Sequence, residues 1–397
     1  MFRQIVTIAL INIATLRTRY GASAVVVIGI AGVVFVLTAL FAMANGLRDT
    51  MQSSGEADRV LLLGKGSRSE INGSITRDQT AIISDLPGIS ASRAPDNPRK
   101  PLVSPEIYLT VNLPRRDNKN RAGLPLRGVS EAAFRVRPEV SITKGRSVVP
   151  GQFELIVGEA AARMFEGLGI GEQIALKGVM FTVVGHFSAD GRSTESEAWL
   201  DVNVMANVFN RTTMNTIRAR LDSPKALDML SAAILADKRL DNTIFRESDF
   251  YNEQSESSTR LMTIVGVTVG FIMSLGAIAT ALNSLYGAVS ARTREIAILR
   301  AIGFPAMPIL ISVLFESLVM SLIGGVLGAG MGWLVFDGFS MTSMGGAYSQ
   351  VAFRFSVEPT LLLTGTLIAL LIGLVGGLLP AVRAARMCVV DGLRSVA

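Results

Sequence analysis

The stretch ARTREIAILRAIG, residues Ala291–Gly303, is charged, yet it lies between two long apolar runs, and this contrast decides the fold. The runs on either side, residues 261–282 and 309–336, are each long enough to cross a hydrocarbon core of about 30 Å as a helix. Gly303 is a residue type at which helices commonly end, and Pro305 opposes any continuation of the helix. The stretch therefore predicts a short helix that joins two membrane-spanning helices.

The composition of the whole chain also indicates a membrane protein. Of the 397 residues, 49% are hydrophobic and 18% are charged, whereas a soluble domain carries about 25% charged residues. The net charge of +6 comes with arginines that flank the apolar runs, which indicates membrane topology rather than nucleic-acid binding. The chain has a single cysteine, Cys388, and a single histidine, His186, which excludes an intrachain disulfide framework and the usual zinc motifs.

Four apolar runs predict an α-helical integral membrane protein with four transmembrane helices, plus a large α+β extracytoplasmic (periplasmic) domain inserted between helices 1 and 2. The first 20 residues have one apolar face, which predicts an amphipathic helix at the membrane surface. In chain order we expect an interfacial helix at 1–20, the first transmembrane helix and the start of a stalk at 21–48, the periplasmic domain at 49–258, the second transmembrane helix at 259–290, the connecting helix at 291–304, the third transmembrane helix at 309–336, a short periplasmic loop at 337–359, the fourth transmembrane helix at 360–382, and a tail at 383–397.

The arginines predict which ends of the helices face the cytoplasm. Arginine is frequent before the first run, between the second and third runs, and after the fourth run, whereas residues 337–359 contain only Arg354. The arginines concerned are Arg3, Arg17, Arg19, Arg292, Arg294, Arg300, Arg383, Arg386 and Arg394. Because cytoplasmic segments are enriched in Lys and Arg, we expect both termini and the connecting helix on the cytoplasmic side.

Residues 49–258 show short strand patterns that alternate with helix patterns, which is typical of a split βαβ domain with a β-rich insertion. One lobe is expected from about 57–113 and 201–248, and the inserted β-rich lobe from about 114–200. We expect strands at 59–63, 107–113, 155–157, 174–176, 180–185, 216–221 and 243–247, and helices at 77–86, 159–165 and 225–235. The prolines of residues 95–105 indicate an irregular connection.

No segment shows the residues of an enzyme site. The chain has no G-x-x-x-x-G-K-[ST] loop, so we expect that it does not itself bind ATP in the P-loop manner. Ser188 and Asp190 lie near His186, which permits a Ser/His/Asp site, but a lone histidine at the end of a strand is more often structural. We therefore predict no catalytic residue, no metal site and no cofactor on this chain.

Glu316 is a carboxylate inside the third apolar run, where an ionised side chain is costly and usually faces protein or a watery cavity. One interpretation is a coupling or gating contact. The other places Glu316 near the cytoplasmic end of its helix, bonded to a neighbouring helix or to Arg292 or Arg294. The sequence leaves both interpretations open.

Glycines recur every four residues in the apolar runs, a spacing that lets membrane helices approach closely. These predicted packing residues are Gly266, Gly270, Gly324, Gly328, Gly332, Gly373 and Gly377. The rows could serve packing within one subunit or a dimer interface, and we favour packing within the subunit for most of them.

Several segments resemble the FtsX-like, MacB-type permeases of ABC transporters. RTREIAILRAIGF (Arg292–Phe304) resembles the family stretch R-T-x-E-I-G-I-x-[RK]-A-[IL]-G, with Ala297 where glycine is usual. FESLVMSLIGGVLGAGMG (Phe315–Gly332) is similar to the family's third span, including its glutamate, and NGLRDTM (Asn45–Met51) to its exit from the first span. VGEAAARMF, LGIGEQIAL and FTVVGHF, within residues 157–187, resemble the MacB-type periplasmic core.

The end of the chain, LLPAVRAARMCVVDGLRS (Leu378–Ser395), resembles the family ending P-A-x-x-A-[AS]-x-x-x-P-x-[ED]-A-L-R. Val389 replaces the usual proline there, and Gly392 replaces the usual alanine. The resemblance thus covers nearly the whole chain, and the order of the motifs is more specific than any one of them.

The resemblance implies a permease that receives mechanical work from a separate cytoplasmic ATPase, which would bind ATP and magnesium. Its coupling helix would contain Arg292, Arg294, Glu295, Ile296, Leu299, Arg300 and Gly303. The family also implies a second permease copy, most simply a homodimer, in a bacterial inner membrane. The periplasmic domain would have a split porter-like lobe and an inserted β-rich lobe.

The resemblance favours a role in efflux or export, in a tripartite system with a periplasmic membrane fusion protein and an outer-membrane channel. Two other roles within the family are lipoprotein release and FtsX-like control of a cell-wall hydrolase. A membrane-anchored sensor is a different class of protein, and it would need a cytoplasmic output domain that these residues do not contain.

Overall fold

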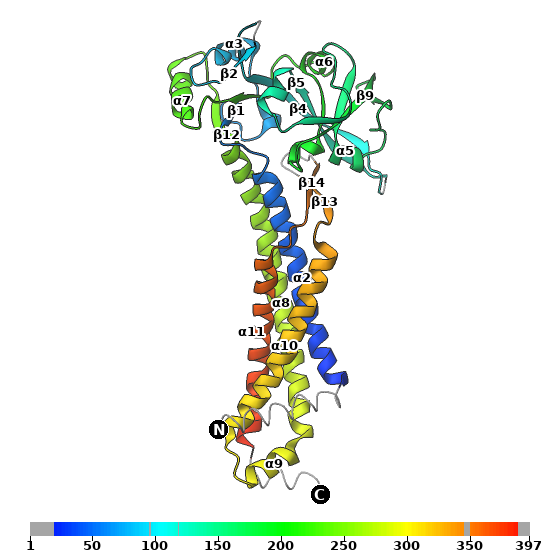
Figure 1. Ribbon diagram of the computed structural model, residues 1–397, viewed down its shortest axis with the longest axis vertical. Coiled ribbons are helices and arrows are strands. Elements are labelled where there is room, and N and C mark those ends of the chain that lie inside the picture. The colour runs from blue at the N-terminus through cyan, green and yellow to red at the C-terminus, as the bar shows by residue number, and fades with distance from the viewer. Residues whose placement is uncertain (1–19, 95–96, 118, 345–349, 388–397) are drawn as a thin grey trace. The chain divides into compact units, whose positions relative to one another are not determined.

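The computed structural model describes residues 20–94, 97–117, 119–344 and 350–387. The predicted interfacial helix at 1–20 therefore lies almost wholly outside the described residues, as does most of the predicted tail. The chain divides into a helical unit, comprising Met1–Asn45, Thr259–Phe339 and Phe355–Ala397, and a sheet unit, comprising Gly46–Ser258 and Ser340–Arg354. Figure 1 shows both units, and each is described by itself below.

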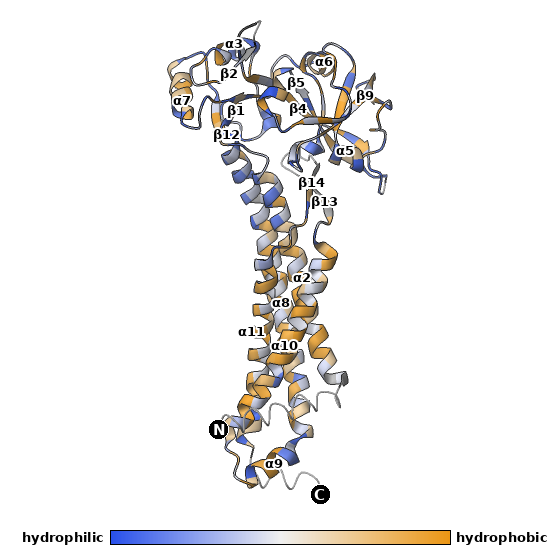
Figure 2. Ribbon diagram, in the orientation of Figure 1, coloured by the Kyte–Doolittle hydropathy of each residue, from blue (hydrophilic) through white to orange (hydrophobic). Residues whose placement is uncertain are grey.

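Four long helices and one short helix build the helical unit. The long helices are α2 (Tyr20–Gln52), α8 (Glu247–Ala291), α10 (Ala306–Phe336) and α11 (Pro359–Arg386), and the short helix is α9 (Thr293–Ala301). In the described part of the chain, these four long helices are the ones long and apolar enough to cross a membrane. Figure 2 shows the corresponding concentration of hydrophobic residues along them. The polar sequences at the end of α2 and the start of α8 are helical, as predicted.

Glycines bring the long helices of the helical unit close together. A Cβ atom on Gly324 would lie 2.9 Å from the carbonyl oxygen of Val27 in α2, and one on Gly328 would collide with the carbonyl oxygen of Ala31. A Cβ on Gly332 would meet Thr38, also in α2. The backbones of α10 and α2 can therefore touch only because these positions lack side chains.

The other predicted glycines also face helices of the same chain. Gly266 and Gly270 of α8 lie against α2, where a Cβ would meet Leu40, Phe41 and Leu37. In α11, Gly373 and Gly377 lie against Ser321 and Ser317 of α10. The Ser317 hydroxyl donates a 2.6 Å hydrogen bond to the Gly373 carbonyl, which adds a polar contact between two helices in an apolar medium.

The sheet unit is built on a ten-stranded mixed sheet. Its strands are β1 (Arg59–Leu63), β4 (Val103–Pro114), β5 (Arg121–Val129), β6 (Ser141–Gly145), β7 (Glu154–Gly158), β8 (Gln173–Leu176), β9 (Val179–Ser188), β10 (Ala198–Asp201), β11 (Thr216–Arg220) and β12 (Thr243–Arg246). The order is β12-β1-β11-β4-β5-β10-β7-β9-β6, and β8 pairs with β9.

Strand β4 belongs to both halves of this sheet. Its first residues, Val103–Glu106, pair antiparallel with β11, whereas Ile107–Pro114 pair with β5. One half of the sheet therefore contains β12, β1 and β11, and the other contains β5, β10, β7, β9 and β6. The strands of both halves contribute to one hydrophobic core, so the halves fold as a single unit.

Short helices cover the sheet. They are α3 (Arg77–Ser84), α4 (Ala132–Val136), α5 (Glu159–Met164), α6 (Val202–Val208) and α7 (Ala226–Ala236), with 3-10 turns η1 (Glu70–Asn72) and η2 (Ser193–Ser196). In Figure 1, α3 and α7 lie near the β12–β1 end, and α5 and α6 near the other half. Every predicted strand and helix of this region overlaps an observed one, but β5, β6, β10, α4 and α6 were not predicted.

Two segments expected to be irregular form β-structure instead. The proline-rich connection contains β2 (Ala91–Ala94) and β3 (Asn97–Pro101), which pair antiparallel as a separate ribbon. A two-stranded ribbon tolerates proline because the missing N–H can fall on its open edge. Residues 337–359, expected to be a short loop, contain the hairpin β13 (Ser340–Met344) and β14 (Gln350–Arg354). The Ala352 amide donates to the Ser196 hydroxyl at 2.9 Å, so this hairpin docks on η2 of the sheet unit.

Gly328 and Gly330 of α10 allow a test of whether close packing of α10 against α2 stabilises the chain. Gly328→Ala should lower the melting temperature of the detergent-solubilised chain by several degrees, because overpacking costs about 1–3 kcal/mol. Gly330→Ala is the matched control, since no atom lies within 4 Å of its Cβ position, and alanine favours a helix over glycine. Thermal unfolding of both variants checks this, and equal melting temperatures would contradict close packing at Gly328.

Candidate functional site

Helix α9 is the short charged helix that the sequence predicted, and its ends have clear structural causes. Only Arg292 separates the end of α8 at Ala291 from the start of α9. At the other end, Gly303 has φ +102°, a value that glycine adopts most readily. The Phe304 amide donates to the Leu299 carbonyl and the Gly303 amide to the Arg300 carbonyl, both at 3.1 Å. This is the Schellman pattern of a helix end, so the predicted glycine stop is confirmed.

One face of α9 is buried against the helical unit. Ile296 is 8% exposed and Ala297 is 1% exposed. Ile296 belongs to a small apolar cluster with residues of α8, α10 and α11, namely Val289, Ile309, Val313, Ala381 and Ala384. This cluster holds the middle of α9 by hydrophobic burial.

Arg292 and Glu316 face each other at the start of α9. An Nη1 atom of Arg292 lies 3.7 Å from Oε2 of Glu316 in α10, and the two side chains are 11% and 7% exposed. The pairing follows the interpretation in which Glu316 bonds to Arg292. Beside this pair is a cavity of about 100 Å³, lined by residues of α8, α9 and α10 that include Glu295, Leu299 and Ser312.

Arg300, at the end of α9, also turns inward. Its Nη1 atom donates a hydrogen bond to the Ala385 carbonyl at 2.6 Å and to the Met387 carbonyl at 3.4 Å. These carbonyls lie at the C-terminal end of α11, where helix carbonyls lack intrahelical partners. Arg300, which the resemblance assigns to the coupling helix, therefore bonds to α11 of the same chain.

The outward face of α9 mixes charge and apolar surface. Arg294 and Glu295 are exposed, whereas Leu299 is half-buried and Gly303 is exposed at the end of the helix. Ile298 is 42% exposed and Ile302 is 72% exposed. The coupling-helix residues implied by the resemblance did not include Ile298 or Ile302. The spacing 294, 298, 302 would have identified this face, because residues four apart lie on one side of a helix.

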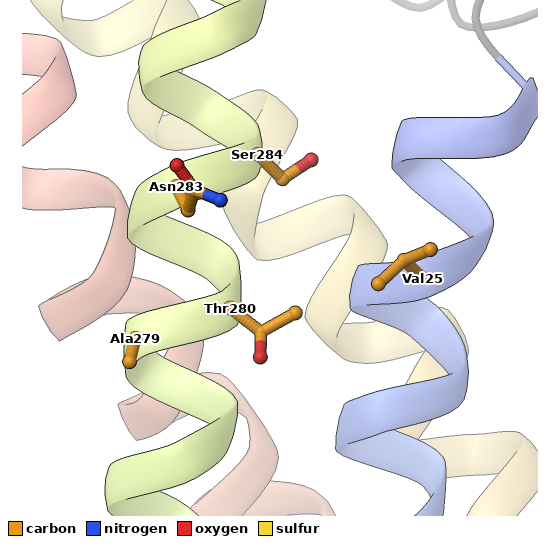
Figure 3. Close-up of a pocket in the computed structure, with 5 residues that line it drawn as sticks. All are labelled: Val25, Ala279, Thr280, Asn283 and Ser284. Carbon is orange, nitrogen blue, oxygen red and sulfur yellow. The ribbon is translucent and has the colours of Figure 1, made fainter.

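A second surface of the helical unit is a groove between α2 and α8, shown in Figure 3. Val25 of α2 and Ala279, Thr280, Asn283 and Ser284 of α8 line a volume of about 440 Å³. In Figure 3, Thr280 and Ser284 point toward the side of α2. Polar side chains in an otherwise apolar helix are costly next to lipid, so such a groove favours contact with another polar or protein surface.

The sheet unit contains a buried charge network that the sequence did not predict. It joins Arg59, Glu70, Glu106, Arg127, Arg137, Glu139, Glu197, Arg218 and Glu247. Arg127 lies at its centre, with Nη1 at 2.9 Å from Glu70 and 2.8 Å from Glu106, and Nη2 at 2.7 Å from Glu197. The guanidinium groups of Arg127 and Arg137 also lie over the rings of Tyr108 and Trp199.

Glu247, the first residue of α8, connects that helix to the network. Its carboxylate accepts from Arg59 Nε at 2.5 Å and from the Glu56 amide at 3.2 Å, and it lies 2.9 Å from Arg218 Nε. Arg59 and Arg218 come from β1 and β11, so ion pairs fix the start of α8 to the sheet. A carboxylate at a helix N-terminus is also favoured by the helix dipole.

The network shifts the pKa of its carboxyl groups in opposite directions. Burial alone raises the pKa of Glu70, but the charges of Arg127 and Arg218 outweigh it and lower that pKa below the ordinary value. Burial prevails at Glu197 and raises its pKa, although Arg127 opposes the shift. Glu70 therefore keeps its charge to a lower pH than an ordinary carboxyl group, whereas Glu197 takes up a proton at a higher pH than one.

His186 has a structural environment. Its Nε2 atom lies 2.8 Å from the Leu168 carbonyl, and the Ser188 hydroxyl donates to Glu195 at 2.7 Å. Glu195 also accepts from the amides of Ala189 and Gly191, so it organises the turn after β9. Among the described residues, no group of three or more His, Cys, Asp or Glu side chains has the arrangement of a metal site.

Comparison with known families identifies both parts of the chain. Residues 23–237 match the model of the MacB-like periplasmic core domain, and residues 267–388 match that of the FtsX-like permease C-terminal region. The first match covers more than half of the chain.

Individual relatives are distant. The chain is 25% identical over 399 residues to the macrolide export ATP-binding/permease protein MacB of Vibrio parahaemolyticus, covering 93% of this chain and 56% of that protein. It is 27% identical over 232 residues to the uncharacterized ABC transporter permease YknZ of Bacillus subtilis, covering 56% of this chain and 55% of that one. The crystal structure of the periplasmic region of MacB from Actinobacillus actinomycetemcomitans aligns with a TM-score of 0.37 at 13% identity, covering 51% of this chain and 95% of that one. The chain spans about half the length of the curated relatives it matches.

Removal of the central arginine tests the charge network. Arg127→Met should destabilise the sheet unit by about 3–5 kcal/mol, because it leaves buried carboxylates without their partner. The variant can be made in a Trp333→Phe background, so that Trp199, which donates to Glu197 at 2.7 Å, is the fluorescent reporter of unfolding. Arg163→Met is the control, since Arg163 is exposed and its surface ion pair with Glu159 spans 3.5 Å.

The difference in stability between wild type and Arg127→Met should depend on pH. The lowered pKa of Glu70 means that its ion pair contributes stability above the ordinary carboxyl pKa, and that this contribution is lost as the pH falls through the folded pKa. Between pH 7 and about pH 4.5 the difference in stability between wild type and Arg127→Met should therefore stay nearly constant, and it should shrink as the pH falls further. A difference that did not shrink below about pH 4.5 would show that lost packing, not charge, causes the destabilisation.

Proposed function

Because this chain belongs to the MacB-like, FtsX-like family of ABC transporter permeases, we propose that it couples ATP hydrolysis by a separate cytoplasmic ATPase to movement of its extracytoplasmic domain. The observation that carries the proposal is α9, a short helix with a buried face fixed to the helical unit and a free face that mixes charge with isoleucine. Such a surface suits docking to a soluble protein, because an apolar centre with charged surroundings is typical of protein interfaces.

In this proposal α2, α8, α10 and α11 cross the membrane, and the domain between α2 and α8 lies outside the cytoplasm. The arginines near α9 and at the end of α11 support this orientation, which places α9 and both termini in the cytoplasm. The membrane would be a bacterial inner membrane, as for exporters of this family.

The docking surface for the ATPase would consist of Arg294, Glu295, Ile298 and Ile302, with Gly303 at its edge. The sequence-based set also contained Arg292, Ile296, Leu299 and Arg300. Ile296 is buried, and Arg292 and Arg300 bond to other helices of the chain, so these three would hold α9 in place rather than meet the partner. The ATPase would bind ATP and magnesium, and this chain would be a non-catalytic subunit.

Two helices could carry movement from one unit to the other. Both α2 and α8 are continuous, and the division between the units falls within each of them. A continuous helix is stiff over its length, because every backbone hydrogen bond opposes bending. Export is the favoured outcome of such movement, in a tripartite system with a membrane fusion protein and an outer-membrane channel, and the macrolide export proteins among the relatives support it.

A second copy of the chain would complete the membrane part. The window of α8 that is apolar enough to span a membrane is only 17% buried within one copy, far less than in α10. Large apolar residues are exposed along it, including Ile264, Val267, Phe271, Ile272 and Leu275. The polar groove beside Asn283 lies on the same helix, and polar groups at a contact between membrane helices stabilise association. A homodimer through α2 and α8 would cover both features.

Capture of the ATPase tests the proposal. The full chain, purified in mild detergent, should retain an ABC ATPase, and Arg294→Glu combined with Ile298→Asp should reduce that capture at least tenfold. Loss of an interface centre of this kind costs about 2 kcal/mol or more. Arg163→Glu reverses the charge of an exposed residue of the sheet unit, as Arg294→Glu does in α9, and should leave capture unchanged. A wild-type chain that retains no ATPase, or a double variant that retains as much as wild type, would refute the proposal.

A further inference from the structure

Helix α9 is joined to its neighbours by very short segments, so its orientation needs additional contacts. One residue, Arg292, separates it from α8, and the turn after Gly303 leads directly into α10 at Ala306. A helix of this length would not be stable alone, because short isolated helices are marginal in water. The contacts at its two ends therefore decide how a force applied to α9 is passed on.

The first contact is the ion pair of Arg292 with Glu316, at 3.7 Å and largely buried. The cavity of about 100 Å³ lies directly beside the pair, and it is lined in part by Val289, Ile296, Ile309 and Val313 of the apolar cluster. Removal of one partner of a buried pair leaves an uncompensated charge, so the two side chains strongly favour remaining together. This contact joins the start of α9 to α10.

The second contact is the hydrogen bond from Arg300 to the Ala385 carbonyl at 2.6 Å. A cation at the C-terminal carbonyls of a helix is favoured both by those unpaired groups and by the helix dipole. This contact joins the end of α9 to α11, a helix with which α9 shares no direct chain connection.

A third contact joins α11 to α8. The guanidinium group of Arg383, in the last turn of α11, lies 5.4 Å from the centre of the Tyr286 ring in α8. A cation over an aromatic ring is attracted to its face. The ends of α8, α9, α10 and α11 are thus tied to one another by three arginines, each through a different chemical contact.

We infer that Arg292 and Arg300 are positioning residues that fasten the two ends of α9 to α10 and α11. A force on α9 would then move α9, α10 and α11 together. The inference rests on the proposed function and deepens it. Docking and force transfer are assigned to different faces of the same short helix: Arg294, Glu295, Ile298 and Ile302 bind the ATPase, whereas Arg292 and Arg300 transmit its movement.

The two roles predict separable variants. Arg300→Met keeps the length of the side chain but removes the donors, so the complex with the ATPase should still be captured within twofold of wild type. The wild-type permease should change the ATP hydrolysis rate of the ATPase relative to that of the free ATPase. Arg300→Met should reduce this change by about tenfold or more. Arg300→Lys keeps a charged donor group and should recover part of this change in hydrolysis rate. A loss of folding alone would not explain that recovery. The docking variant Arg294→Glu should instead reduce capture itself.

Two results would overturn the inference: Arg300→Met reduces capture as strongly as Arg294→Glu, or it leaves coupled hydrolysis unchanged. If the wild-type chain captured no ATPase, the proposed function would fail, and the fastening can still be measured on the chain alone. Arg292→Met and Glu316→Gln should each lower the melting temperature. The melting temperature of the double variant should be no lower than that of the less stable single variant. Additive losses in that cycle would show that the two side chains act independently and would contradict the fastening at α10.

Discussion

The ion pair between Arg292 and Glu316 sets the direction in which the chain leaves α8. Arg292 is the one residue between α8 and α9, and its side chain reaches inward to a carboxylate that an apolar helix would not otherwise contain. An isolated carboxylate in hydrocarbon would be very costly, so the pair constrains α10 as much as it constrains α9. The cavity beside it is lined in part by the apolar cluster around Ile296, so charge adds to apolar packing at this corner. The outward face of α9 depends on this contact, because a rotated α9 would present other side chains.

Helix α8 is held by buried ion pairs near both of its ends. At its start, Glu247 meets Arg59 and Arg218 within the sheet unit. Just after its end, Arg292 meets Glu316 within the helical unit. Between these points the helix exposes most of its apolar surface, so within one copy its position relies on its ends and on the glycine contacts with α2. Buried charge pairs add little net stability compared with apolar packing, but they strongly disfavour alternative geometries, and the transmission of movement proposed for α8 needs a defined geometry.

The sequence identified elements well because the signals that form them are local. Apolar runs of membrane length, the Gly303 stop and the strands on either side of Lys177 and Gly178 depend on residues close together in the chain. The hairpin of β13 and β14 escaped prediction because each strand has only five residues, and because it docks on Ser196, far away in the sequence.

Side-chain partners could not be predicted in the same way. A charged residue looks like a solvated one until the fold brings its partner near. Arg127 and Glu197 are 70 positions apart, and nothing in the sequence near either of them marks it as buried. Arg300 has charged and apolar neighbours on α9, so its turn toward the Ala385 carbonyl became visible only with α11 in place. The glycine rows could be predicted because glycines recur every four residues, whereas the two partners of an ion pair show no regular spacing in the sequence.

If movement applied at α9 reaches the sheet unit, hydrogen exchange of the full chain in complex with the proposed ATPase will show it. Exchange would be compared between the nucleotide-free complex and the complex trapped with ATP and vanadate. We expect altered protection at α9 and also within residues 46–258, including the start of α8 around Glu247, where ion pairs fix the helix to the sheet. Altered protection confined to α9 and the ATPase, with the sheet unit unchanged, would contradict it.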